Sequence, residues 1–316
     1  MSGVPIVTFH PGIDPLGPAV VAIGVFDGVH RGHQALVGRA SASASGRGVP
    51  CIALTFDRDP DQVVTPDESS PQLLALADKS TFLRAAGADI VLVVPFDENI
   101  ASMSPDQFVS RVLCVSCTPS VVHVGVDFRF GRFAAGNVAD LTALGGGCRF
   151  TVEPFDLVEH RGAPVTSTRI RGLVARGDVA GAAELLGRPH RVRGMVVKGR
   201  GEGRARLGIP TANILPVEHA ALPAAAVYAG RVLLPDGDTR PAGISVGVPP
   251  TFPHAHDVLE AHLIGFEGEL LHAEVVLEFE ERLREQRAFE TMGELATAMR
   301  ADFERVQALV PGRASR

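Results

Sequence analysis

Two histidines near the start of the chain, His30 and His33, have the type and spacing to act on a phosphate group. They end the stretch GVFDGVHRGH, which follows an apolar run, Val20 to Ile23, typical of a buried strand. A strand, a glycine-bearing turn and a helix start favour a bound anion, because free backbone amides and the helix dipole attract negative charge. Imidazole donors there could follow charge onto a phosphate in the transition state. The stretch therefore predicts a phosphate site, although an HxxH pair alone is more often ordinary surface or core histidine.

Other polar segments of the first half fall at predicted strand ends or helix starts, where open α/β sheets bind ligands. They are the loop after Phe56, the segment GVDFRFG at 125–131 and the segment TSTRIR at 166–171. In the last segment, hydroxyl, amide and guanidinium groups converge at a helix start, and they belong to Ser167, Thr168 and Arg169. Ser-Thr before a helix is usually a simple cap. Two complementary anion sites in one α/β domain are nevertheless typical of a protein that handles nucleotide phosphates.

The second half carries a glycine-rich segment, VVKGRGEGRARLGIPTANI, at 196–214. Its glycines, Gly199 and Gly208 among them, let the backbone approach a phosphate closely. The PTAN string then places the hydroxyl of Thr211 and the amide oxygen of Asn213 on one edge of an extended segment. Hard oxygen ligands of this kind suit Mg²⁺ held together with substrate phosphates. The plain alternative is a flexible Gly/Arg hairpin.

A carboxylate further along the second half could act as a base. Glu260 lies in the string LEAHL, and His262 follows two residues later, so both side chains face the same side of a predicted strand. A carboxylate at such a place could accept a proton from a substrate hydroxyl. Without the other motifs, the same strand would be interpreted as a half-exposed edge.

The elements that must position these residues differ between the two halves. Up to about residue 186, strands alternate with helices, which indicates an α/β domain with a parallel sheet. The expected strands are 20–23, 51–56, 90–94, 121–126 and 150–155. The expected helices are 34–45, 73–86, one that Ser104 caps and that has Pro105 in its first turn, and 138–144. From residue 187 short apolar runs follow one another at turn signals, which predicts a small antiparallel barrel or sandwich. An amphipathic helix over 289–310 ends the chain.

Composition limits the classes of function. The chain has 316 residues, 46% of them hydrophobic and 21% charged, which is ordinary for a globular enzyme of two domains. A net charge of −6 with no long basic run, and no tryptophan, argue against a nucleic-acid surface. No signal peptide or membrane-length apolar run is present, so we expect a cytoplasmic protein. The four cysteines include a single CxxC, Cys114 and Cys117, and are expected to be buried reduced thiols.

Taken together, these motifs resemble the bifunctional riboflavin kinase/FMN adenylyltransferase family of bacteria, the prokaryotic FAD synthetases. GVFDGVHRGH, GVDFRFG and TSTRIR are similar to the family's nucleotidyltransferase motifs, and LGIPTANI, AVYAG, VGVPPTF, LEAHLIGF and LREQRAF are similar to its kinase module. The resemblance implies a Rossmann-like adenylyltransferase domain over 1–186. It also implies a flavokinase-type β-barrel with a C-terminal helix over 187–316. The implied reactions are ATP-dependent phosphorylation of riboflavin to FMN and adenylylation of FMN to FAD.

The resemblance also implies roles for individual residues. The catalytic residues would be His30 and His33, at the α-phosphate of ATP, and Glu260, the base on the ribityl hydroxyl. ATP for adenylylation would contact Gly24, Phe26, Asp27, Gly28, His30, His33, Ser167, Thr168 and Arg169. The flavin would contact Asp127, Phe128 and Arg284. ATP for the kinase would contact Gly199, Gly208, Pro210, Thr211 and Asn213, of which Thr211 and Asn213 would bind Mg²⁺. The implied partners are small molecules, with self-association left open.

One departure from the family pattern concerns the loop after the second predicted strand. The family usually has Pro-His-Pro there, whereas this chain has Arg58-Asp59-Pro60. An anion near the phosphates would hinder adenylyl transfer unless Mg²⁺ or Arg58 offsets its charge. Two alternatives therefore stay open from the sequence: a chain in which only the kinase module works, and a flavin-binding regulator that has lost turnover.

Overall fold

The structure is a computed structural model that describes residues 5–198, 211–247 and 259–310. The chain forms two compact units. Unit 1 comprises Met1–Gln72 and Leu76–Thr166, and unit 2 comprises Leu73–Ala75 and Ser167–Arg316. By packing, the two helices α8 (Ser167–Ala175) and α9 (Val179–Leu186) therefore belong with unit 2. The functional boundary at 186/187 stays a prediction.

Unit 1 is built on a six-stranded sheet in the order β1-β4-β3-β2-β5-β6, with every pair parallel. The strands are β1 (Ile6–Thr8), β2 (Pro18–Ile23), β3 (Cys51–Phe56), β4 (Ile90–Val94), β5 (Thr118–Gly125) and β6 (Thr151–Phe155). The sequence predicts all of these except β1, a three-residue strand too short to leave a pattern. The strand order reverses at β2, which pairs with both β3 and β5. The carboxyl end of β2 is therefore the topological switch point at which such sheets bind ligands.

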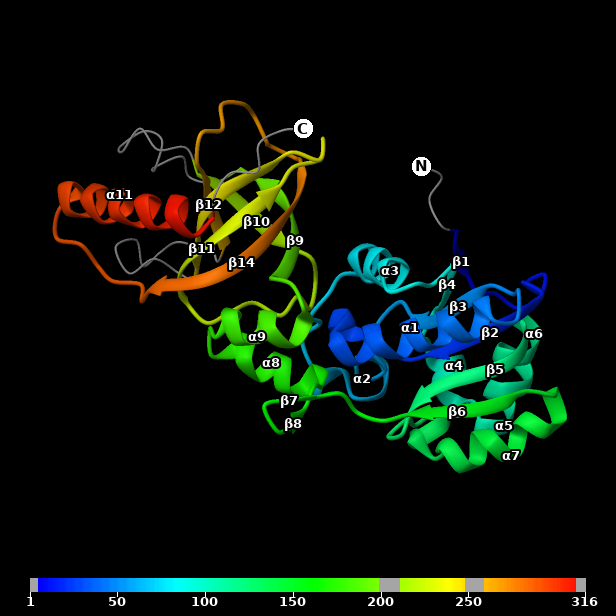
Figure 1. The fold of residues 1–316 in the computed structure, drawn as a ribbon. Coiled ribbons are helices and arrows are strands. Elements are labelled where there is room, and N and C mark those ends of the chain that lie inside the picture. Colours follow the sequence, from blue (N-terminus) through cyan, green and yellow to red (C-terminus); the bar gives the residue numbers. More distant parts are fainter. Residues whose placement is uncertain (1–4, 199–210, 248–258, 311–316) are drawn as a thin grey trace. The chain divides into compact units, whose positions relative to one another are not determined.

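Helices and turns surround this sheet (Figure 1). They are η1 (Asp27–Val29), α1 (Arg31–Ser45), α2 (Asp61–Val64), η2 (Pro66–Glu68), α3 (Leu76–Ala85), α4 (Glu98–Ser102), α5 (Pro105–Phe108), η3 (Val109–Leu113), α6 (Cys114–Ser116), η4 (Arg132–Ala134) and α7 (Val138–Cys148), with a small ribbon of β7 (Glu159–His160) and β8 (Ala163–Pro164). Val21 and Ile23 of β2 join a core with α5, η3 and α7, while Val20 and Ala22 on the other face are also fully buried. Burial on both faces explains why this strand is continuously apolar.

The cysteines differ in part from the expectation of four reduced thiols. Cys51 and Cys117 are free and buried, as expected, but the sulfur atoms of Cys114 and Cys148 are bonded to each other. The start of α6 and the end of α7 bring their Cα atoms to 6.4 Å across a sequence separation of 34. That proximity is a product of tertiary packing, and nothing in the spacing of the cysteines shows it.

Unit 2 contains a closed antiparallel barrel in the order β10-β13-β12-β11-β14-β9. The strands are β9 (His190–Val197), β10 (Ala212–Pro216), β11 (Ala226–Leu233), β12 (Thr239–Val246), β13 (Leu259–Leu263) and β14 (Glu274–Arg284). Buried and less buried residues alternate along β13, which places Leu259, Ala261 and Leu263 in the core of the barrel. Glu260 and His262 therefore project from its outer face. The sequence allows either a barrel or a sandwich, and the structure shows a barrel.

The helix α11 (Met292–Leu309) lies beside this outer face (Figure 1). Thr291 caps its first turn by accepting a hydrogen bond from the backbone N–H of Glu294. Val306, with Val310 just after the helix, packs into a small core with Leu283 of β14, which confirms the predicted packing by one face. Among the described residues, we find no helix with both the length and the apolarity needed to span a bilayer.

Candidate active sites

The turn between β2 and α1 brings the two predicted histidines into contact. His30 is the N-cap of α1, and its Nδ1 accepts a hydrogen bond from the backbone N–H of His33 at 3.3 Å. Their rings stack with centroids 3.6 Å apart, and the ring of Phe26 meets His33 edge-on at 5.2 Å. The turn needs left-handed backbone at Phe26, Gly28 and Val29, with φ of 54°, 78° and 38°. Glycine accepts such a φ without strain, whereas the backbone strain at Val29 must be offset by favourable packing around it.

Two more predicted ATP contacts belong to the same turn. A side chain on Gly24 would meet the ring of Phe26 at 2.9 Å, so the phenylalanine that supports His33 requires glycine there. Asp27 is 2% exposed and lies within the turn. The sequence thus places Gly24, Phe26, Asp27 and Gly28 in one local structure, and their contacts with ATP stay predictions.

The loop after β3 holds the departure from the family pattern. Asp57 accepts a hydrogen bond from the backbone N–H of Phe96 at 2.8 Å and forms an ion pair with Arg58 at 3.1 Å. Asp59 is only 4% exposed, so its charge is largely screened from solvent by protein. Arg58 therefore pairs with its neighbour Asp57 in this loop.

A buried lysine that the sequence does not single out contacts the start of this loop. Lys79 of α3 is 1% exposed, and its Nζ donates hydrogen bonds to the carbonyl oxygens of Val25 and Phe56, both at 3.1 Å. Burial lowers the pKa of Lys79 from its ordinary value, and the nearby carboxylates of Asp59, Asp27 and Asp57 oppose that shift. A lysine within an amphipathic helix is most often solvated, so only the tertiary structure shows that this one is buried.

The GVDFRFG motif forms the turn that follows β5. Asp127 is exposed, and Phe128 donates its backbone N–H to the carbonyl of Gly125 at 3.0 Å. The ring of Phe128 stacks on that of Phe130 with centroids 5.5 Å apart. The half-buried Phe128 ring and the neighbouring Asp127 thus lie at the carboxyl edge of the sheet of unit 1, where the sequence predicts flavin contacts.

The TSTRIR motif forms the first turn of α8, with Ser167, Thr168 and Arg169 at the helix start as predicted. The segment that leads into it belongs to unit 1. There the carbonyl oxygen of Val165 lies 3.6 Å from the position of a Cβ built on Gly32. The backbone just before TSTRIR therefore passes the HRGH turn, while a phosphate site shared by the two motifs stays a prediction.

The second predicted site lies on the barrel of unit 2. In the register of the sheet, Asn213 of β10 is opposite Glu260 of β13, and Glu260 is opposite Ser245 of β12. Opposed residues in antiparallel strands have their side chains on the same face, about 5 Å apart at Cβ. The structure therefore brings the predicted metal ligand and the predicted base together on the outer face of the barrel, from strands 47 residues apart in the sequence.

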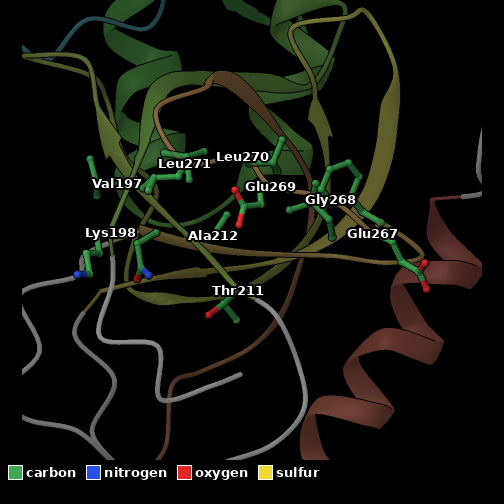
Figure 2. Close-up of a pocket in the computed structure, with 13 residues that line it drawn as sticks. Val197, Lys198, Thr211, Ala212, Glu267, Gly268, Glu269, Leu270 and Leu271 are labelled. Carbon is green, nitrogen blue, oxygen red and sulfur yellow. The ribbon is translucent and has the colours of Figure 1, made fainter. Parts of the chain in front are cut away.

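A cavity of about 550 Å³ opens beside this pair. Among the described residues, its lining includes Thr211 and Asn213 but neither Glu260 nor Arg284. Figure 2 shows Thr211 and the carboxylate of Glu269 beside the same space. Within the described part of the chain, the buried Oδ1 of Asn213 has no hydrogen-bond partner. An acceptor oxygen left without a donor at a cavity is suited to a cation or to a donor of a ligand.

Arg284, the predicted flavin contact of the kinase, is held by α11. Its Nε and Nη2 donate to the carboxylate of Asp302 at 3.0 and 2.8 Å, and Asp302 is 6% exposed. The ring of Phe289 lies 5.7 Å from the guanidinium carbon. Gln286, two residues after the end of β14, contacts β12, because its Nε2 donates a hydrogen bond to Ser245 Oγ at 2.9 Å. The sequence pattern does not reveal Asp302, a polar residue in a helix predicted only from its apolar face, and it gives no role to Gln286, which lies in the LREQRAF string.

Two protein families match the chain. The FAD synthetase family matches residues 14–169, and the riboflavin kinase family matches residues 186–310. The bifunctional riboflavin kinase/FMN adenylyltransferase of Pseudomonas fluorescens is 37% identical over 300 residues, which cover 94% of each chain. The chain belongs to this family. The enzymes of the same name from Escherichia coli (strain K12) and Bacillus subtilis (strain 168) are 31% and 30% identical over 91% and 90% of each chain.

A solved structure has a closely similar fold. The crystal structure of a macrolide-efflux protein from Streptococcus pneumoniae has a TM-score of 0.83 and 27% identity, and the match covers 96% of this chain and 98% of that one. For this member of the riboflavin kinase/FMN adenylyltransferase family, three predicted ATP contacts of the kinase, Gly199, Gly208 and Pro210, lie outside the described residues. The remaining predicted residues all belong to the described part of the chain.

Proposed function

We propose that this chain makes FAD in two ATP-dependent steps. It phosphorylates riboflavin to FMN with the domain over 187–316 and adenylylates FMN to FAD with the domain over 1–186, releasing pyrophosphate. The observation that carries this proposal is the pairing of Asn213 with Glu260 on the barrel, in a chain whose other unit carries the stacked His30 and His33. Family membership over nearly the whole chain favours this function over a kinase alone or a regulator without turnover.

In the kinase step, Glu260 is the general base. It accepts the proton of the ribityl 5′-hydroxyl as that oxygen forms a bond to the γ-phosphorus of ATP, and the bond from that phosphorus to the β,γ-bridging oxygen breaks to release ADP. Glu260 lies between β10 and β12, both paired with its own strand, so its backbone is fixed on both sides. Such a base can hold a defined direction toward a hydroxyl that binds at the outer face of the barrel.

Magnesium fits the residues beside this base. The buried Oδ1 of Asn213, which has no partner in the described part of the chain, and the hydroxyl of Thr211 line the same cavity and are hard oxygen donors. These two residues would hold Mg²⁺ together with phosphate oxygens of ATP. When bound, the ion neutralises charge that develops on the transferred phosphoryl group. The described residues contain no cluster of three or more His, Cys, Asp or Glu side chains suited to a metal, which agrees with a site completed by substrate oxygens.

In the adenylyl transfer step, a phosphate oxygen of FMN attacks the α-phosphorus of ATP, and the bond to the β-phosphate breaks to release pyrophosphate. His30 and His33 donate hydrogen bonds to the α-phosphate as negative charge increases on its oxygens. The start of α1 adds backbone amides and the positive end of the helix dipole. Ser167, Thr168 and Arg169 hold the β- and γ-phosphates that leave.

The proposal also includes the flavin contacts, the location of the protein and its partners. Asp127 and Phe128 contact the flavin of FMN in unit 1, where the stacked Phe128 and Phe130 rings offer an aromatic surface. Arg284 contacts riboflavin in unit 2 while Asp302 holds its guanidinium in place. The protein works in the cytoplasm on small molecules and ATP, with no nucleic-acid or membrane partner, and self-association is compatible with this function.

A time course of flavin products tests the proposal. The purified chain is incubated with riboflavin, ATP and Mg²⁺, and riboflavin, FMN and FAD are separated at intervals. FMN should appear first and FAD later, and FMN supplied directly with ATP should give FAD and pyrophosphate in equal amounts. Failure to consume either flavin would refute the proposal, and FMN as the final product would refute its adenylyl transfer half.

A further inference from the structure

A disulfide joins two helices of unit 1 at the edge of the sheet opposite the HRGH turn. Cys114 begins α6 and Cys148 ends α7, and their sulfur atoms are bonded to each other. These helices lead into the neighbouring parallel strands β5 and β6 (Figure 1). The bond therefore lies near the amino ends of these strands, whereas the HRGH and GVDFRFG turns follow the carboxyl ends of β2 and β5. Its effect is accordingly expected on local structure and not on substrate contacts.

The last turn of α7 has a sequence that disfavours a helix. The sequence predicts a helix that ends at residue 144, but α7 continues through three glycines to Cys148. Glycine loses more backbone entropy in a helix than any other residue. Gly145 has a packing reason, because a Cβ there would lie 2.7 Å from the carbonyl oxygen of Phe150. Gly146 and Gly147 have none, since within the described part of the chain a Cβ on either would meet nothing within 4 Å outside its own helix.

The residue that ends α7 is also unfavourable for its backbone conformation. Arg149 is the C-cap, and its φ of 63° is left-handed, a conformation for which glycine is the usual residue at a helix end. The backbone N–H groups of Arg149 and Phe150 both donate to the carbonyl of Gly145 and so close the last turn. Glycines thus stand where a helix favours alanine, and an arginine stands where glycine is favoured. The last turn therefore depends on a contact from outside α7, and the bond to Cys114 supplies one.

The four cysteines of the chain differ in their access to redox chemistry. Cys51 and Cys117 are fully buried, and burial raises the pKa of each thiol to about 12. Exchange with a disulfide proceeds through the thiolate, so these two thiols are unreactive near neutral pH. Cys114 and Cys148 are only half-buried, so a small reductant can reach their bond. The bonded pair is therefore the part of the chain that can respond to redox conditions.

We propose that Cys114 and Cys148 form a reversible link that keeps the last turn of α7 folded while oxidised and releases it when reduced. A thiolate of a dithiol reductant attacks one sulfur of the bond, and the other cysteine leaves as a thiolate. The second thiolate of the dithiol then displaces the first cysteine, so the dithiol is oxidised to a disulfide and both cysteines are reduced to thiols. A small-molecule disulfide closes the link by the reverse exchange. For a chain proposed to work in the cytoplasm, such bonds are usually transient or redox-sensing.

Hydrogen exchange on the whole chain tests the proposal. Dithiothreitol should speed exchange at the backbone amides of Arg149 and Phe150 at least about tenfold, and oxidised glutathione should then reverse the change. Gly146→Ala combined with Gly147→Ala should slow exchange in the reduced chain about fivefold or more, because alanine restores helix propensity without a clash. Gly38→Ala is the matched control, since it lies within α1 and should leave exchange at the two amides unchanged.

A cysteine variant and thiol labelling complete the test. Cys148→Ser should exchange like the reduced wild type, with or without dithiothreitol. In the native chain, labelling should reach Cys114 and Cys148 only after reduction, and Cys51 and Cys117 only in denaturant. Equal exchange in oxidised and reduced wild type would overturn the proposal, as would a bond that dithiothreitol cannot open or glycine substitutions without effect. None of these measurements needs turnover, so their failure is distinct from failure of the proposed function.

Discussion

Asn213 and Glu260 are directly opposite each other in the pairing of β10 with β13, with both side chains on the outer face of the barrel. This pairing brings together the two motifs of the second half that most strongly indicate chemistry, the PTAN string and the LEAHL string. Each string by itself has an ordinary interpretation, as a hairpin or as an edge strand. Their pairing places a hard oxygen ligand and a carboxylate about one side-chain length apart, as transfer of a phosphoryl group to a hydroxyl requires.

Replacing the proposed base should stop one reaction and leave the other. We expect Glu260→Gln to lower kcat for riboflavin phosphorylation by roughly 10²- to 10⁴-fold, the range for loss of a general base. Adenylylation of supplied FMN should continue at the wild-type rate. Glu218→Gln is the matched control, since the side chain of Glu218 is 90% exposed and pairs with His219 at the surface. Kinase activity retained in Glu260→Gln would exclude Glu260 as the base.

The opposite separation is expected for the HRGH turn. His33→Ala should lower kcat for FAD formation from FMN by about 10²- to 10³-fold, because a donor to the charge that develops in the transition state is lost. FMN formation from riboflavin should not change. His10→Ala is the control, because His10 is an exposed histidine of the same unit, and its Nδ1 lies 3.3 Å from the neighbouring carbonyl oxygen of Pro11. Loss of both activities in a folded His33→Ala protein would contradict the two-site arrangement.

The regular elements of the fold could be predicted because their patterns are local. The continuous apolar runs at β2 and β4 predict buried strands, and the Ser104 cap before Pro105 predicts the start of α5. The structure confirms that cap, since the hydroxyl of Ser104 accepts from the backbone N–H of Gln107. In contrast, β1 is missed because a three-residue strand leaves no periodic signal. The short helices α2 and η2 lie in a segment predicted as a loop, where proline and acidic residues hide single turns.

The sequence singles out candidate site residues but not the contacts between them. His30, His33, Asn213 and Glu260 are chosen from residue type and spacing, because phosphate chemistry restricts both, and their roles stay predictions. Lys79 is missed because a lysine in a helix has no signal for burial. The pairing of Cys114 with Cys148 is missed for a related reason, as it depends on where two helices end in space. Contacts between distant segments arise from tertiary packing, which single-sequence patterns do not encode.

The ion pair between Arg284 and Asp302 should stabilise unit 2 and hold α11 in place. Its hydrogen bonds of 2.8 to 3.1 Å join a side chain that is 24% exposed to one that is 9% exposed. We expect Asp302→Ala to lower the free energy of unfolding of unit 2 by about 2 kcal/mol, less than for a fully buried pair because Arg284 is partly solvated. It should also raise KM for riboflavin, since Arg284 loses its support.

A weaker ion pair between the same two elements supplies the control for Asp302→Ala. Arg305 and Glu281 approach to 3.7 Å and are 50% and 46% exposed. Glu281→Ala should therefore change the free energy of unfolding by less than about 0.5 kcal/mol. Denaturant unfolding of each variant, followed by a signal specific to unit 2, gives both values. Equal effects of the two substitutions would show that the Arg284 pair contributes no more than an ordinary surface pair.

A buried histidine should make the stability of unit 2 depend on pH. His190 is 1% exposed, and burial lowers its pKa to about 4, which the hydrogen bond between its Nε2 and the carbonyl of Ala221 only partly opposes. The unfolded chain, with an ordinary histidine pKa near 6.5, binds the proton first as pH falls. This contribution to stability is therefore complete above about pH 6.5 and is lost between about pH 6.5 and pH 4.

We accordingly expect the free energy of unfolding of unit 2 to fall by about 2 kcal/mol between pH 7 and pH 5 through this residue. The variant His190→Gln keeps a donor for the carbonyl of Ala221 and cannot titrate, so its stability should change less over the same range. His219→Gln is the control, because the side chain of His219 is 46% exposed. This substitution should leave the pH dependence of unfolding as in wild type. Urea unfolding at both pH values measures the three proteins, and an unchanged pH dependence in His190→Gln would show that His190 is not the group responsible.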